Sequence, residues 1–240
     1  MELVRVPTGI GVRAPEGVTP IPAILGIGMN YAAHAMEQGK GVPERPVVFT
    51  KNLAAGALSG DEIRVPKVCQ ERPQVDFEGE LGVVIGRRRD GRPVRDVPAD
   101  EALACVWGYV VANDVSARWW QKEGSGGQFW RGKSFDTFCP VGPRVVPAAE
   151  VGDPQALRLV TKVNGAVMQD TRTSDMIFDV ARLVSDLSRG ITLLAGTLIL
   201  TGTPSGVGMA RMPPVFLKDG DEVEIEIERV GAIRNRVRFE

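Results

Sequence analysis

Short apolar runs, broken by glycine and proline, form the main hydrophobic pattern of this chain. Its 28 glycines and 17 prolines in 240 residues favour short strands and turns over long helices. Glutamates alternate with valine and isoleucine from Glu222 to Glu228, which predicts a strand with one solvated and one buried face. In all, seven runs predict strands, at residues 23–27, 47–50, 81–85, 107–113, 157–163, 198–201 and 222–227.

Helical spacing is clearest after the Thr-Ser-Asp sequence at 173–175. Apolar residues recur at helical intervals from Ile177 to Leu187, and Gly190 is placed to end that helix. Because helices and strands do not alternate regularly, a doubly wound parallel sheet is not expected. The pattern predicts an α+β fold that is predominantly β, with a surface loop at 87–98. Two shorter helices are expected, at 100–105 and 31–38.

Composition and charge are those of an ordinary globular protein, with 43% hydrophobic and 25% charged residues. Twenty-nine Lys and Arg residues against 30 Asp and Glu residues give a net charge of -1. That balance gives no reason to expect nucleic acid or a membrane as a partner. No signal-peptide pattern is readable, and no apolar run approaches the roughly 20 residues of a membrane span. We expect a soluble protein of the cytoplasm.

A single histidine, His34, limits the metal chemistry of the chain. One imidazole cannot supply a His-rich zinc site or a two-histidine iron site. The three cysteines lie far apart and form no C-x-x-C pair, so a thiolate site is not expected either. Any metal must therefore be held mainly by carboxylates.

Acidic residues precede an apolar run in the segment that begins at Asp76. Asp76, Glu78 and Glu80 are two residues apart, so on a continuous strand they would share one face. Like charges this close repel, so a basic side chain, raised pKa values or a divalent cation must compensate. A solvated acidic strand face, as at 222–228, is the alternative. The apolar residues that follow show no polar alternation, which favours a buried strand and a cation.

Two further features bear on chemistry. An apolar strand ends at Asn113-Asp114, a common position for ligands and equally for turn residues. His34 and Glu37 are three apart, so on a helix the carboxylate could orient the imidazole as a general base, or the pair could be a surface feature. Glycine-rich stretches at 26–31 and 201–208 lack complete nucleotide-binding fingerprints, so neither predicts nucleotide binding.

Seven segments, taken in order, resemble the fumarylacetoacetate hydrolase family. Each alone is a weak motif, but the ordered set is highly specific and spans nearly the whole chain from about residue 24. The resemblance implies a mixed β-sandwich roll as a catalytic domain at 24–240, after a short N-terminal segment at 1–23. The matching segments are GMNYAAH at 28–34, DFEGEL at 76–81, NDVSAR at 113–118, RGKSFD at 131–136, VNG at 163–165, TSDMIF at 173–178 and TGTPSGVG at 201–208.

The resemblance also implies a homodimer and a bound Mg²⁺ or Mn²⁺ ion. Carried over position by position, the metal ligands are Glu78, Glu80 and Asp114, with Asp76 as a neighbour that is not a ligand. Carboxylate oxygens with open water sites suit Mg²⁺. The open sites would accept the carboxylate and 2-oxo oxygens of a small 2-oxo acid substrate.

Substrate-binding roles follow from the same resemblance. Arg118, Gln121 and Lys133 would surround the carboxylate and oxo groups of the substrate, and Thr203 would form a hydrogen bond to the carboxylate. Lys133 would also stabilise enolate charge as it develops. Trp119-Trp120 departs from the family, which often has Asp after the Ser/Thr-Ala-Arg sequence, so the support of Arg118 is expected to differ.

The function that the resemblance implies is hydrolysis of a C–C bond in an acylpyruvate-type 2,4-dioxo acid. Cleavage would pass through a metal-bound pyruvate enolate. His34 and Glu37 would lie on a short helix that closes over the substrate, and the pair would activate the attacking water. An isomerase or decarboxylase of a 2-hydroxymuconate-like diacid or of oxaloacetate, in the catabolism of aromatic compounds, is the alternative. A non-catalytic binder of a metal or small molecule is a further alternative.

Overall fold

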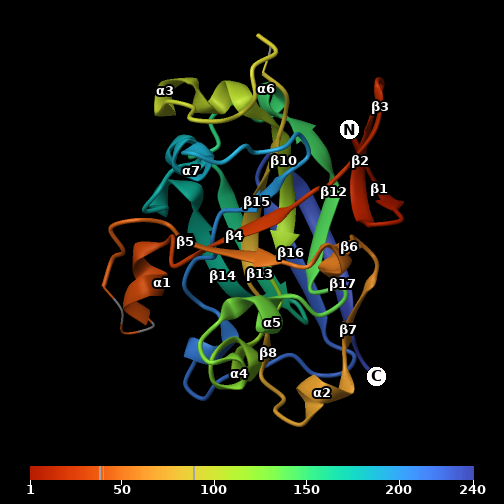
Figure 1. Cartoon of the computed structure of the whole chain (residues 1–240). Coiled ribbons are helices and arrows are strands. Elements are labelled where there is room, and N and C mark those ends of the chain that lie inside the picture. The colour runs from red at the N-terminus through yellow and green to blue at the C-terminus, as the bar shows by residue number, and fades with distance from the viewer. Residues whose placement is uncertain (38, 40, 89) are drawn as a thin grey trace.

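Two curved β-sheets carry the fold, which is α+β and predominantly β (Figure 1). The structure is a computed structural model that describes every residue except 38, 40 and 89. In the described part of the chain the larger sheet has ten strands in the order β3-β2-β1-β12-β10-β9-β15-β4-β5, with β6 paired to β12. These strands are β1 (Glu2–Val6), β2 (Gly9–Ala14), β3 (Gly17–Pro20), β4 (Ile24–Gly28), β5 (Val47–Lys51), β6 (Gly56–Leu58), β9 (Gly79–Ile85), β10 (Val106–Asn113), β12 (Cys139–Pro147) and β15 (Leu198–Leu200).

The smaller sheet has the order β14-β13-β16-β17-β7, and a separate two-stranded sheet pairs β11 with β8. Antiparallel pairs dominate it, and β17 pairs in parallel with β7. These strands are β7 (Glu62–Val65), β8 (Val75–Asp76), β11 (Ser116–Ala117), β13 (Arg158–Val163), β14 (Ala166–Arg172), β16 (Glu222–Ile227) and β17 (Gly231–Phe239).

The core lies between the two sheets and continues on the other face of the larger one. One apolar cluster combines residues of β9 and β10 with residues of β16, β17 and helix α7. A second cluster uses the opposite faces of β9 and β10, together with β2 and β15. Strand β9 is consequently buried at all of its seven positions, which explains why its sequence shows no polar alternation.

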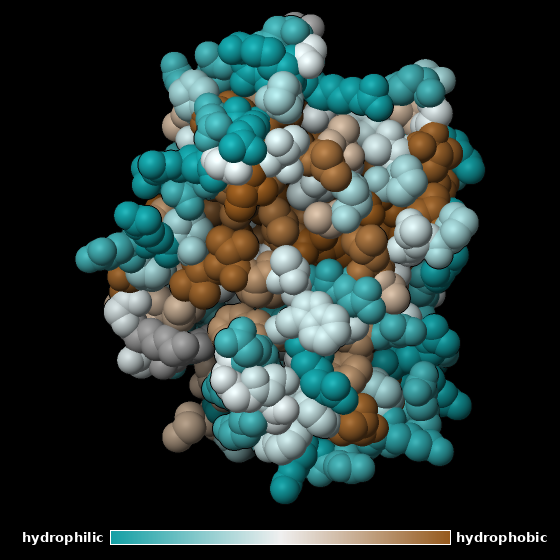
Figure 2. All heavy atoms as spheres, in the orientation of Figure 1, coloured by the Kyte–Doolittle hydropathy of each residue, from teal (hydrophilic) through white to brown (hydrophobic). Residues whose placement is uncertain are grey.

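The N-terminal residues add strands to the larger sheet. Strands β1, β2 and β3 form an antiparallel meander, and β1 pairs with β12 where Glu2 lies opposite Arg144. Figure 2 shows apolar side chains gathered in the middle of one face of the molecule, surrounded by polar ones. Among the described residues no helix is both long and apolar enough to cross a membrane.

All seven strands predicted from the sequence are present, with ends that differ by two residues or fewer. Strands β1 to β3, β6 to β8, β11, β12, β14 and β17 were not predicted. Most of them are short, and short strands bury few side chains. The exceptions include β12 and β17, which have nine residues each; β17 alternates between buried and exposed positions and was overlooked. The loop at 87–98 lies mostly at the surface, although Val94 and Val97 are buried in the core.

The helix prediction after residue 175 is wrong at its start. Helix α7 spans Val180–Ser188 and is capped by Asp179, whose carboxylate accepts a hydrogen bond from Arg182 N–H at 2.7 Å. Ile177 lies outside the helix because its N–H donates to Asn30 O, and the Asn30 side chain binds both backbone groups of Phe178.

The remaining helices are short. The predicted helix at 100–105 appears as helix α3 followed by a 3-10 turn, and the prediction at 31–38 appears as helix α1, with residue 38 outside the described residues. These helices are α1 (Ala32–Glu37), α2 (Lys67–Gln70), α3 (Ala99–Ala102), α4 (Arg118–Gln121), α5 (Phe129–Lys133) and α6 (Ala148–Val151), and the 3-10 turns are η1 (Leu53–Ala55), η2 (Leu103–Cys105), η3 (Glu123–Ser125), η4 (Thr173–Asp175) and η5 (Gly208–Ala210).

Candidate active site

A break in the backbone separates the acidic residues at 76–80. Strand β8 ends at Asp76 and β9 begins at Gly79, so the three acids do not share the face of one continuous strand. At the break, Phe77 N–H donates to Asp76 Oδ1 at 2.9 Å and Glu78 N–H donates to Asn113 Oδ1 at 3.0 Å. These side-chain acceptors replace the ladder partners that a continuous strand would have.

Three buried carboxylates converge beside the break. Glu78, Glu80 and Asp114 each place one oxygen so that the three oxygens lie within 4.8 Å of one another. Strand β9 carries Glu80, and Asp114 follows directly after its neighbour β10, where Asp114 N–H donates to Glu78 O at 2.9 Å. Gly79 permits this arrangement because a Cβ there would lie 2.2 Å from Thr161 Oγ1.

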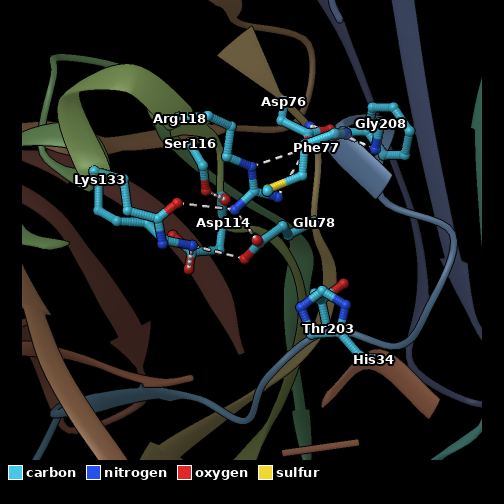
Figure 3. Close-up of polar contacts among 12 residues, drawn as sticks. His34, Asp76, Phe77, Glu78, Asp114, Ser116, Arg118, Lys133, Thr203 and Gly208 are labelled. Carbon is cyan, nitrogen blue, oxygen red and sulfur yellow. Dashed lines mark hydrogen bonds and ion pairs between the residues drawn. The ribbon is translucent and has the colours of Figure 1, made fainter. Parts of the chain in front are cut away.

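Two lysines neutralise part of this charge, and Figure 3 shows one of them, Lys133, beside Asp114 and Glu78. Lys133 Nζ lies 2.6 Å from Glu78 Oε2 and 2.5 Å from Asp114 Oδ2. Lys51 Nζ lies 2.5 Å from Asp114 Oδ1, and both side chains of that pair are fully buried. Sequence reasoning missed Lys51, although its place at the end of an apolar strand, where a charged side chain needs a buried partner, points to such a role.

Arg118 links the carboxylate cluster to Asp76. Its Nη1 lies 2.7 Å from Glu78 Oε1, and its Nε donates to Asp76 Oδ2 at 2.9 Å. Nη1 also donates to Gln121 Oε1 at 3.0 Å. Asp76 accepts two further hydrogen bonds from the backbone of the loop after β15, from Gly208 N–H and Met209 N–H. Asp76 therefore supports Arg118 and is not one of the three converging carboxylates.

The neighbouring Trp119 does not line the pocket. Its ring packs edge-on against Trp120, with centroids 4.8 Å apart, and the Arg72 guanidinium lies 5.8 Å from its centroid. An acid at this position is not needed to hold Arg118, because Asp76 and Glu78 already pair with the guanidinium.

The neighbouring cationic side chains do not balance every carboxylate of the cluster, which fits a bound divalent cation. Burial by itself raises the pKa of Glu78, but the charges of Lys133 and Arg118 outweigh it and lower that pKa to about 2. Glu80 contacts no cationic side chain in the described residues, and burial, followed by the charges of Asp114 and Glu78, raises its pKa well above the ordinary value. A cation among these hard oxygen donors would let Glu80 ionise.

His34 and Glu37 lie together on helix α1, as predicted. His34 is buried, and its Nδ1 lies 3.2 Å from Glu37 Oε2. The other carboxylate oxygen of Glu37 accepts a hydrogen bond from Gly206 N–H at 3.0 Å. Figure 3 shows His34 beside Thr203, on the far side of Glu78 from Lys133. The carboxylate thus fixes the orientation of the imidazole and ties helix α1 to the loop after β15.

Thr203 is held by groups from both sheets. Its hydroxyl donates to Gly79 O at 3.0 Å and accepts from Gln169 Nε2 at 2.8 Å. Gln169 Oε1 in turn accepts from Gly79 N–H at 3.0 Å, so this buried amide connects β14 to the start of β9. The hydroxyl must turn away from Gly79 O before it can donate to a substrate. Sequence reasoning missed Gln169, because an isolated glutamine carries no recognisable pattern.

The pocket over this cluster brings together most of the predicted residues. Glu37 lies behind His34, and Glu80 and Asp114 lie outside the pocket lining. Two phenylalanines of the lining, Phe49 and Phe129, were not predicted as site residues. The lining consists of Ile27, Gly28, Met29, His34, Phe49, Glu78, Arg118, Gln121, Phe129, Lys133 and Thr203.

Comparisons with known sequences agree on one protein family. The family model described as Fumarylacetoacetate (FAA) hydrolase C-terminal matches residues 23–238. The oxaloacetate tautomerase FAHD2A, mitochondrial, of Bos taurus is 47% identical over 220 residues, which are 92% of this chain and 68% of that protein. A 2,4-didehydro-3-deoxy-L-rhamnonate hydrolase of Sphingomonas sp. is 46% identical over 221 residues, which are 92% of this chain and 74% of that protein.

Solved structures share the fold. The fumarylpyruvate hydrolase of Pseudomonas aeruginosa, in complex with Mn²⁺ and pyruvate, has a TM-score of 0.84 and 30% identity and covers 100% of both chains. The 2-hydroxyhepta-2,4-diene-1,7-dioate isomerase of Mycobacterium marinum has a TM-score of 0.77 and 42% identity, over 93% of this chain and 78% of that chain.

Proposed function

This chain belongs to the fumarylacetoacetate hydrolase family and is an enzyme, and we propose that it hydrolyses a C–C bond in an acylpyruvate-type 2,4-dioxo acid. One observation carries the proposal. His34, oriented by Glu37, lines the same pocket as Lys133, Arg118 and Glu78, the last of which belongs to the buried carboxylate cluster. That combination lets a proton acceptor and an anion-binding group of the protein act on the same small substrate.

Glu78, Glu80 and Asp114 are proposed to hold Mg²⁺ or Mn²⁺. A cation there would supply positive charge for the 2-oxo and carboxylate oxygens of the substrate. Their oxygen donors and burial support this, as does the Mn²⁺ in the structure of the fumarylpyruvate hydrolase.

Lys133, Arg118, Gln121 and Thr203 are proposed to bind the 2-oxo acid end. The Lys133 ammonium, held beside two carboxylates, stays protonated and stabilises the enolate that develops when the C3–C4 bond breaks. Arg118 and Gln121 are already joined by a hydrogen bond, so they present their donors in a fixed arrangement. Thr203 donates to the substrate carboxylate after its hydroxyl turns from Gly79 O.

His34 is proposed to take a proton from the attacking water. Because Nδ1 faces Glu37, proton acceptance falls to Nε2, and the carboxylate stabilises the imidazolium that forms. The hydroxide adds to the C4 carbonyl carbon, the C3–C4 bond breaks, and its electron pair becomes the enolate of pyruvate. The proton held by His34 returns to the products, which are pyruvate and a carboxylic acid.

Replacement of the histidine tests this proposal. His34→Ala is expected to lower acetylpyruvate hydrolysis in Mg²⁺ by about 10²- to 10⁴-fold, because the general base is lost. The increase in melting temperature caused by Mg²⁺ should remain, since His34 is not a proposed ligand. Assays with acetylpyruvate, fumarylpyruvate and oxaloacetate, each with Mg²⁺ and with EDTA, give the substrate range. Full hydrolysis by His34→Ala would refute the role of the pair.

Keto–enol tautomerisation of oxaloacetate is the second candidate. The 47% identity to the Bos taurus oxaloacetate tautomerase favours it. Isomerisation of a 2-hydroxymuconate-like diacid or decarboxylation of oxaloacetate are related possibilities, because all of these reactions stabilise an enolate. The same panel of substrates separates hydrolysis from these reactions, since only hydrolysis needs an activated water. Turnover of oxaloacetate without any hydrolysis of acylpyruvates would favour the second candidate.

The proposal extends to a cytoplasmic homodimer that acts in the catabolism of aromatic compounds. An apolar area on one face of the molecule (Figure 2) supports an interface between subunits. Strand β5, at the edge of the larger sheet, also leaves Val48 46% exposed. The Bos taurus relative is named as mitochondrial. Sedimentation at several protein concentrations tests the dimer.

A further inference from the structure

An apolar wall bounds the pocket next to the charged cluster. Met29, Phe49 and Phe129 line it, and none of them has a role in the chemistry proposed above. Lys133 Nζ lies 5.0 Å from the centroid of Phe49, and Phe129 precedes Lys133 by one turn of helix α5. The wall therefore begins at the cluster that binds the 2-oxo acid and extends away from it.

Glycines of β4 seat the two aromatic rings. Phe49 lies opposite Gly26 in the pairing of β5 with β4, and a Cβ at Gly26 would lie 2.2 Å from the Phe49 ring. A Cβ at Gly28 would lie 3.4 Å from Phe129. The rings also contact each other, with centroids 5.6 Å apart. Gly26 thus leaves the space that the Phe49 ring occupies, a role unrelated to nucleotide binding.

The wall offers no partner for a negative charge. Among the described residues of the lining, Lys133 and Arg118 are already paired with carboxylates, and His34 faces the Glu37 carboxylate. The Glu37 carboxylate behind His34 adds a negative charge nearby. A second carboxylate of a substrate that reached the phenylalanines would lose its water without gaining an ion pair.

We infer that this pocket selects 2-oxo acids whose distal group is small and uncharged, such as acetylpyruvate, over dicarboxylates of similar length. The inference rests on the proposed function for the placement of the 2-oxo acid end at the cluster. It names the substrate class of the same site: monocarboxylates with a short alkyl end.

A matched pair of 2-oxo acids tests the inference by binding alone. 2-Oxopentanoate and 2-oxoglutarate have the same chain length and differ by a methyl group against a carboxylate. In calorimetric titrations of the wild-type protein with Mg²⁺, 2-oxopentanoate is expected to bind at least about tenfold more tightly. Equal or tighter binding of 2-oxoglutarate overturns the inference.

A charged variant of the wall sharpens the test. Phe129→Lys is expected to reduce or reverse the preference, because it supplies a cation where the wall has none. Trp130→Lys is the matched control: Trp130 is the next residue of helix α5, is 52% exposed and lies outside the lining, so its preference should equal that of the wild type. An unchanged preference in a folded Phe129→Lys protein overturns the role of the wall. If that variant does not fold, the wild-type pair still decides.

Turnover separates this inference from the proposed function. Acetylpyruvate is expected to give a larger kcat/KM than fumarylpyruvate. If neither is hydrolysed while 2-oxopentanoate keeps its preference, the proposed hydrolysis fails and the selection of uncharged distal groups stands. If both are hydrolysed equally and 2-oxoglutarate binds as well as 2-oxopentanoate, the selection fails and hydrolysis stands.

Discussion

Two stretches of this chain carry acids at alternate positions, and folding gives them opposite surroundings. Strand β16 is unbroken, its valine and isoleucines are buried, and its glutamates reach cations near the surface, as Glu224 does with Lys162 at 2.9 Å. At 76–80 the strand breaks, all three acids are buried, and Glu80 has no cationic partner in the described residues.

The contrast teaches that spacing alone does not distinguish a solvated face from a binding site. Hydrogen bonds from Lys162 and Arg234 lower the pKa of Glu224, whereas burial raises the pKa of Glu80. What separates the two is the adjoining sequence: β9 is buried at every position, but β16 only at alternate ones. A buried strand that begins with acids must bring compensating charge into the interior.

Breaking a buried ion pair should have the largest effect. Lys51→Met is expected to lower the free energy of unfolding by about 3–5 kcal/mol, because it leaves the fully buried Asp114 with one cation fewer. Urea unfolding of the metal-free protein measures this.

Lys162→Met, in the partly buried pair with Glu224, is the matched control. Its side chain is 32% exposed, so the expected loss is about 1 kcal/mol or less. Equal losses in the two variants would show that the two acidic stretches do not differ in the way described.

Removing a proposed ligand should have the next largest effect. At a Mg²⁺ concentration about 100 times the Kd, binding stabilises the wild-type protein by about 2.7 kcal/mol. Glu80→Gln is expected to abolish that gain, which the melting temperature with and without Mg²⁺ reports. Glu226→Gln on the solvated face should keep the full gain. An unchanged gain in Glu80→Gln would place the cation elsewhere.

The smallest effect is an opposite dependence on pH. In metal-free protein the raised pKa of Glu80 gives a contribution that is present below the ordinary value of 4.5 and is lost as pH rises above it. The lowered pKa of Glu224 gives a contribution that is present above 4.5 and is lost as pH falls.

Melting temperatures in EDTA between about pH 4 and about pH 7 test this for the wild type, Glu80→Gln and Glu224→Gln. Relative to the wild type, the first variant should gain stability as pH rises and the second as pH falls. Differences of the same sign would contradict the prediction.

Much of the fold could be predicted because the spacing of apolar residues along a strand shows whether one face or both faces are buried. The runs that became β9 and β10 are largely apolar, and the run that became β16 is apolar at every second position. The start of α7 could not be predicted, because the Asn30 side chain, distant in sequence, takes the backbone groups of Phe178 that a helix would use.

The candidate site divides in the same way. The acidic run alone predicted compensation around Asp76, Glu78 and Glu80. The set Glu78, Glu80 and Asp114 was carried over from the family resemblance, and the structure brings those three together. Lys51 and Gln169 were missed, since each is a single polar residue whose partners lie on other strands. No local pattern records such a partner.

The two oxygens of Glu37 give the site one further property. One faces His34 and the other accepts the N–H of Gly206, in the loop that also carries Thr203. The imidazole and this loop are therefore mechanically coupled through one side chain. Any displacement of this loop would pull on the side chain that orients the imidazole, so the position of His34 depends on the position of the loop.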